Sequence, residues 1–192
     1  MAKKKSSATS AEAIASALAV DATAFLEGFR KKHAKETIYA FLLELSAVGY
    51  AAGAAIATEE SLRRFAEDCV EDFDGDLEKA LRDMRWAGPE EESWYQSPEK
   101  AFRISNQLLE IAEETELYPE YDGSLEKIAL SALKSMMKEG AFGTKQECDA
   151  MVISICHTGG DNSAEDFLRW ASSINSPKVM KRLKKEYSAA DR

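Results

Sequence analysis

The sequence predicts an α+β fold in which about six or seven helices pack a small, mainly antiparallel sheet of roughly three to five strands. Apolar residues recur at helical spacing along much of the chain, and residues 37–45 form an apolar run typical of a strand. The chain has 192 residues, 45% of them apolar, which is enough to bury one sizeable core. We therefore expect a single domain over residues 10–192, preceded by a flexible basic tail over residues 1–9.

The first predicted element is an amphipathic helix after the basic tail. Lys3 to Lys5 and the small apolar run that follows resemble a signal peptide, but Glu12 interrupts that run. A stripe at helical spacing then continues past any cleavage point: Ile14, Leu18, Ala22, Phe25 and Phe29. A helix of the folded domain is the better interpretation.

Residues 37–45 and 49–57 are predicted to pair as an antiparallel hairpin. Apolar side chains fall on both faces of 37–45, as expected for a central strand that is covered on both sides. Ser46 to Gly49 supply the turn, and the alanines and glycine of "YAAGAAIA" would let another element pack closely over the sheet. The run 150–156, "AMVISIC", is predicted to join the same sheet.

Two helices are expected after the hairpin. Thr58 is a suitable N-cap, and Glu59 and Glu60 would lie at the positive end of the helix dipole. The apolar face of this helix would consist of Leu62, Phe65, Ala66, Cys69 and Val70, which predicts that Cys69 is a core residue. "DFDGD" then breaks the chain, and a short helix begins at Leu77.

Four helices are predicted in the second half of the chain. Ser97 and Pro98 would open the first as N-cap and first residue, with a buried stripe of Ile104, Leu108, Ile111 and Ala112. Helical spacing from Ser124 until Gly140 predicts the second. The last two would be capped by Ser163 and by Ser176, which Pro177 follows.

The charge distribution is uneven. The chain has a net charge of −9, but residues 59–126 alone hold 21 acidic and seven basic residues, a net charge of −14. Such a surface repels phosphate backbones, so we expect no nucleic-acid partner and favour a basic protein partner. No run approaches the ~18 apolar residues of a membrane span. The basic segment "PKVMKRLKKEY" could lie on a membrane surface, but Val179, Leu183 and Tyr187 favour packing on the core.

The cysteines and histidines predict neither a disulfide framework nor a metal site. Three cysteines without regular spacing favour a reducing cytoplasm. Together with His33 and His157 they offer too few clustered ligands for a closed zinc site. "EDFDGD" lacks the spacing and the closing glutamate of a calcium loop. We expect no cofactor.

"ISICHTGGDNSAED", residues 153–166, has the residue types of an active site. Adjacent strand residues point to opposite faces, so Cys156 and His157 should not form a nucleophile and base. Gly159 and Gly160 before a helix could cradle phosphate, but Asp161 would itself occupy the free amides. A turn into a helix, capped by Asp161 and Ser163, is the simpler interpretation.

The irregular stretch "RWAGPEEESWYQSPEK" carries the candidate binding residues. Its tryptophans either cover the core or, with the intervening glutamates, form a contact surface. The leading hypothesis is a non-enzymatic protein-binding domain of the adaptor or toxin-neutralising type; the alternative is a hydrolase or transferase that uses carboxylates of 59–126. A cleft with two facing, perturbed acids would favour the enzyme, and a convex acidic face the binding domain. The candidate binding residues are Trp86, Glu90, Glu91, Glu92, Trp94 and Asp161.

Several short motifs together resemble a bacterial family, domain of unknown function 4303. They are "ETIYAFLLEL", "ATEESL", "RWAGPEEESWY", "GAFG" before a strand, an acid after that strand, and "INSPKVMKRL". The resemblance spans about residues 25–187 and implies a small cytoplasmic protein, without an activity, cofactor or catalytic residue. Cys156 and His157 are outside the matching positions, which are Tyr39, Phe41, Thr58, Glu59, Trp86, Trp94, Phe142, Gly143, Asp161, Asn175 and Pro177.

Overall fold

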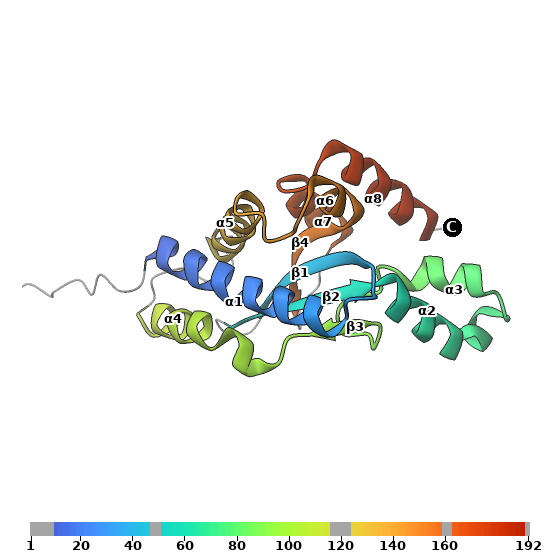
Figure 1. The fold of residues 1–192 in the computed structure, drawn as a ribbon, viewed down its shortest axis with the longest axis horizontal. Coiled ribbons are helices and arrows are strands. Elements are labelled where there is room, and N and C mark those ends of the chain that lie inside the picture. Colours follow the sequence, from blue (N-terminus) through green and yellow to red (C-terminus); the bar gives the residue numbers. More distant parts are fainter. Residues whose placement is uncertain (1–9, 47–50, 116–123, 159–162, 191–192) are drawn as a thin grey trace, which may run out of the picture.

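The structure of the chain, a computed structural model, describes residues 10–46, 51–115, 124–158 and 163–190. The predicted basic tail, most of the hairpin turn, the Gly159–Gly160 pair and the candidate Asp161 lie outside the described residues. Within the described residues, eight α-helices surround a four-stranded sheet (Figure 1). The predicted α+β class is therefore confirmed.

The sheet contains the predicted hairpin at its centre. Its order is β3-β2-β1-β4, with β1 at Ile38–Ser46, β2 at Ala52–Thr58, β3 at Trp94–Gln96 and β4 at Val152–Thr158. β1 pairs antiparallel with β2, and β2 with β3, whereas β4 joins β1 in parallel. The sheet is thus mixed rather than purely antiparallel, because the long helical connection to β4 returns the chain in the direction of β1.

The helices cover both faces of the sheet. They are α1 (Ala11–Lys32), α2 (Glu59–Asp68), α3 (Leu77–Met84), α4 (Arg103–Glu114), α5 (Ser124–Lys138), α6 (Lys145–Ala150), α7 (Ala164–Ser172) and α8 (Pro177–Ala190). In Figure 1, α1 runs between α4 and α5, and it contacts both of these helices over one face of the sheet. α7 packs on β4, and α8 packs on α7 and α3, over the other face. No helix within the described ranges is long and apolar enough to cross a membrane.

The two faces of β1 contribute to two separate cores. Phe41, Leu43 and Leu45 pack with α1 and α5, while Ala40 and Leu42 pack with α7 and α8. A register shift between Ile38 and Ala40 places Tyr39 in the second core as well. This division confirms that 37–45 is a strand with both faces covered.

Local signals set most helix ends as predicted. The Thr58 side chain accepts from the backbone N–H of Ser61, and the Ser163 side chain accepts from that of Asp166. Gly140, at φ 77°, follows α5 in the left-handed conformation that favours glycine. The prediction for Cys69 was wrong: α2 ends at Asp68, so the thiol is half-buried at the helix end.

The prediction that Ser97 caps a helix was wrong. Residues 99–102 form a 3₁₀ turn, and α4 begins only at Arg103. The Ser97 hydroxyl instead accepts from the backbone N–H of Ala54 at 3.0 Å, beyond the end of β3. Ser97 therefore satisfies a strand donor rather than a helix donor.

The predicted buried stripe of α4 was wrong at Ile104 and Ile111, whereas Ala112 is buried as predicted and Leu108 is half-buried against the core. Ile104 and Ile111 are 49% and 40% exposed, and the buried positions are Ser105, Leu109 and Ala112. The cause is Asp21 of α1, whose buried carboxylate accepts from the Ser105 N–H at 3.0 Å and hydroxyl at 2.6 Å. This polar contact turns Ser105 inward, because a buried carboxylate needs donors.

Asn175 forms hydrogen bonds with the backbone of β4, the strand at one edge of the sheet. Its side-chain oxygen accepts from the Ile153 N–H at 3.0 Å, and its amide donates to the Ile153 carbonyl at 2.6 Å and to the Ala171 carbonyl at 2.8 Å. One side chain thus satisfies the backbone of an edge strand and anchors α7 to it.

Candidate functional site

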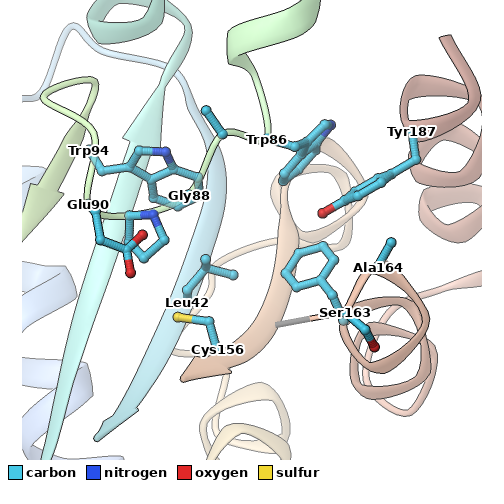
Figure 2. Close-up of a pocket in the computed structure, with 12 residues that line it drawn as sticks. Leu42, Trp86, Gly88, Glu90, Trp94, Cys156, Ser163, Ala164 and Tyr187 are labelled. Carbon is cyan, nitrogen blue, oxygen red and sulfur yellow. The ribbon is translucent and has the colours of Figure 1, made fainter. Parts of the chain in front are cut away.

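A cavity of about 440 Å³ lies on the α7–α8 side of the sheet, beneath the segment between α3 and β3. Figure 2 shows Trp94 and Glu90 on one side of it, Tyr187 and Ser163 on the other, and Leu42 and Cys156 at the sheet. The lining residues are Leu42, Trp86, Ala87, Gly88, Pro89, Glu90, Trp94, Cys156, Ser163, Ala164, Phe167 and Tyr187. The cavity is therefore lined by four parts of the chain that are far apart in sequence: Leu42, the segment 86–94, residues of 156–167, and Tyr187.

Three aromatic rings form one wall of the cavity. Ring centroids lie 5.9 Å apart for Trp86 and Tyr187, 6.0 Å for Trp86 and Phe167, and 5.7 Å for Phe167 and Tyr187. The Trp86 indole N–H donates to Glu186 at 3.2 Å, which fixes the ring orientation. Burial raises the pKa of Tyr187 to about 12, so its phenol stays neutral. The wall is therefore aromatic and uncharged.

Trp94 contributes an unused hydrogen-bond donor. Its side chain is 6% exposed, and its buried Nε1 has no hydrogen-bond partner among the described residues. A buried indole N–H usually finds an acceptor, and leaving it unpaired costs about 1–3 kcal/mol. An acceptor supplied from outside these residues would recover that free energy.

Gly88 shapes the loop that carries Glu90. Its φ of 115° lies in the region that favours glycine, and an added Cβ would lie 2.8 Å from Glu90 Oε2. The carboxylate of Glu90 thus folds back over the Gly88 backbone while it lines the cavity. Glu90 forms no ion pair with any described residue.

Glu44 is a second carboxyl group at this face of the sheet. It is 6% exposed and lies in register between Gly53 of β2 and Cys156 of β4. Its side chain covers Gly53, where an added Cβ would be 3.2 Å from Glu44 Oε2. Burial, and then the charge of Glu90, raises the pKa of Glu44 to about 7. Glu44 does not itself line the cavity.

The structure separates Cys156 from His157. The Cys156 thiol faces the cavity, and burial followed by the charges of Glu44 and Glu90 raises its pKa well above the ordinary value. His157 lies on the other face, with Nε2 3.2 Å from Glu126 Oε1 and its ring 5.5 Å from that of Trp170. A neutral thiol without an adjacent base is not an activated nucleophile.

The structure brings together three of the predicted binding residues, Trp86, Glu90 and Trp94. The interpretation that the tryptophans cover the core is confirmed for Trp94, which is buried and also lines the cavity, while Trp86 is half-buried. Glu91 and Glu92 are exposed and lie outside the cavity lining. Asp161 lies outside the described residues.

Glu91 and Glu92 extend the acidic surface towards α2. Burial, together with the charges of Asp72, Asp68, Glu91 and Glu92, raises the pKa of the Cys69 thiol. These carboxylates come from two segments that are separate in sequence, residues 68–72 and 91–92. Asp68, Asp72, Glu91 and Glu92 therefore lie near one another, around Cys69.

Sequence reasoning missed Glu44, Phe167 and Tyr187 as residues of this region. Glu44 had a usable signal, because it is the one charged residue inside the apolar run 38–46. Phe167 and Tyr187 had none, since an aromatic residue on a helix stripe looks the same whether it faces a core or a cavity.

A second carboxylate cluster, around Glu36, is fully paired. Glu36 accepts from the hydroxyls of Thr58 at 2.6 Å and Tyr95 at 3.0 Å, and lies 3.1 Å from His33 Nδ1. Burial alone would raise the pKa of Glu36, but these hydrogen bonds and Arg64 hold it below its ordinary value. We interpret this cluster as a structural link. Among the described residues, no group of three or more His, Cys, Asp or Glu could hold a metal.

The chain matches the model of a known family. The model of a family described as "Domain of unknown function (DUF4303)" matches residues 16–176. No curated protein and no solved structure matches the chain. The family match covers the sheet, the aromatic residues of the 85–94 segment and the whole of α7, but not α8 with Tyr187.

Proposed function

The chain belongs to the DUF4303 family, as its motifs predicted, and from the geometry of its site we propose that it is a non-enzymatic protein-binding domain. In this proposal the acidic loop, residues 88–92, contacts a basic partner protein. The role is of the adaptor or toxin-neutralising type, in the cytoplasm of a bacterial cell, and involves neither nucleic acid nor membrane. The three free cysteines fit a reducing compartment.

One observation carries the proposal: the acidic loop presents three exposed glutamates beside an aromatic cavity. Glu90, Glu91 and Glu92 form no ion pair with any described residue, so their charge is available to a partner. Aromatic anchors next to charge are typical of interface centres. The net charge of −14 over residues 59–126 would steer a basic partner towards this surface.

A specific observation also favours the alternative, a hydrolase or transferase. Glu44, with a pKa of about 7, and Glu90, which raises that pKa, could divide the roles of general acid and base. Against this, Glu44 is outside the cavity lining, so it does not directly reach a group bound there. The binding domain accounts for more of the site than the enzyme does.

The test is the association rate of two charge-reversed variants with a partner captured from native lysate. One variant carries Glu90→Lys, Glu91→Lys and Glu92→Lys. Its matched control reverses three exposed glutamates of α4 (Glu110, Glu113 and Glu114), which gives the same change in net charge. Exposed substitutions usually alter stability by about 0.5 kcal/mol or less, so both variants should fold.

We expect the loop variant to associate about tenfold more slowly at low salt and to lose most of its salt dependence, because local charge dominates steering. The α4 control should keep most of the wild-type rate and slope. Wild-type association by the loop variant, or equal slowing of both variants, would exclude the acidic loop as the contact.

A further inference from the structure

We infer that the cavity beneath the acidic loop binds the cationic side chain of a lysine or arginine residue of the partner protein. This inference rests on the proposed function, since it names the group that the acidic loop recognises. It assigns the cavity one occupant, a positively charged side chain on a peptide backbone.

The first argument is the aromatic wall. Trp86, Phe167 and Tyr187 line the cavity with ring centroids about 6 Å apart, so a cation bound in the cavity would lie beside several aromatic rings. The electron-rich face of an aromatic ring attracts ammonium and guanidinium groups at up to about 6 Å. The same rings would cover the aliphatic part of a lysine or arginine side chain.

The second argument is charge complementarity. None of the described residues that line the cavity is a lysine, arginine or histidine, and the one charged residue among them is Glu90. Glu90 forms no ion pair with any described residue. An entering cation would therefore meet a negative charge that the described residues leave unpaired.

The third argument is the size of the cavity. The occupant belongs to a polypeptide because the proposed function gives the acidic loop a protein partner. The cavity of about 440 Å³ lies in the range of roughly 300–1,000 Å³ that is usual for small-ligand pockets, so one side chain fits.

The test is a titration of the full chain, followed by nuclear magnetic resonance of its indole N–H groups. The probes are the Nα-acetyl N-methylamides of arginine and lysine, and the control probe is that of norleucine, which is apolar and uncharged. Trp86 and Trp94 line the cavity, while Trp170 belongs to the other core and serves as an internal reference.

We expect the cationic probes to shift the Trp86 and Trp94 resonances and leave Trp170 unchanged, with norleucine amide binding about tenfold more weakly. Glu90→Gln should weaken the cationic probes several-fold without affecting norleucine amide. Glu99→Gln removes another exposed carboxylate, one outside the cavity, and should bind like the wild type. Equal binding of norleucine amide, or no shift of either indole, would overturn the inference.

The two proposals can fail separately. If the probes shift neither indole but the loop variant still loses association with the partner, the cavity inference is wrong and the acidic contact surface stands. If the probes bind as expected but the loop variant associates like the wild type, the cavity recognises a cation and the proposed contact surface is wrong.

Discussion

Glu44 should make the stability of this protein fall as the pH rises through neutrality. The pKa of its buried carboxyl group is about 7, compared with an ordinary value of 4.5. Between these values the folded chain holds a proton that the unfolded chain has released, so the free energy of unfolding decreases as pH increases. At about 1.4 kcal/mol per pH unit, the shift from 4.5 to about 7 corresponds to about 3 kcal/mol.

Glu44→Gln removes this titration, because an amide of nearly the same shape cannot ionise. The measurement is urea unfolding of the wild type and the variant at about pH 5 and about pH 8.5, followed by tryptophan fluorescence. From the lower to the higher pH, the free energy of unfolding of the variant should rise by roughly 2.5 kcal/mol relative to that of the wild type. This is less than the full effect, because part of the change is already complete at the lower pH.

The control for this experiment is Glu99→Gln, which neutralises an exposed carboxylate and should show no such gain. A gain below about 0.5 kcal/mol for Glu44→Gln would refute the reasoning, since it would mean that Glu44 ionises at an ordinary pH in the folded chain.

Two further predictions concern the edge strand and the thiols. Asn175→Ala should lower the free energy of unfolding, measured in urea, by about 2–3 kcal/mol, because it leaves the Ile153 N–H, the Ile153 carbonyl and the Ala171 carbonyl without this partner. A loss below about 0.5 kcal/mol would show that water replaces the amide. Cys156, 3% exposed, should react with iodoacetamide at least about tenfold more slowly than Cys69 in the folded protein and at a similar rate in urea, as measured by mass spectrometry. Fast labelling of Cys156 that His157→Ala abolishes would contradict the separation of these two side chains.

Local sequence signals determined most of the elements. The cap at Thr58, the glycine after α5 and the apolar alternation of 37–45 each depend on residues within a few positions of one another. These local preferences are much the same in almost any tertiary context. A helix end must satisfy its own free backbone groups, and successive strand residues always point to opposite faces. The sequence also identified Trp86, Glu90 and Trp94 as candidates, since aromatic and acidic residues together in an irregular segment are unusual.

The tertiary structure decided what those elements face. The inward face of α4 depends on the contact between Asp21 and Ser105, which are separated by 84 positions, and no periodicity within α4 reveals it. The parallel direction of β4 likewise depends on the path of the helices before it.

The candidate site shows the same division. The sequence by itself determined which residues could anchor a partner, namely the tryptophans and glutamates of one segment. Only the tertiary structure decided that they share a cavity with Cys156 and Tyr187, and that Glu44 lies buried beside it. The physical reason is that burial and electrostatic coupling depend on distances between side chains far apart in sequence, which local patterns do not encode.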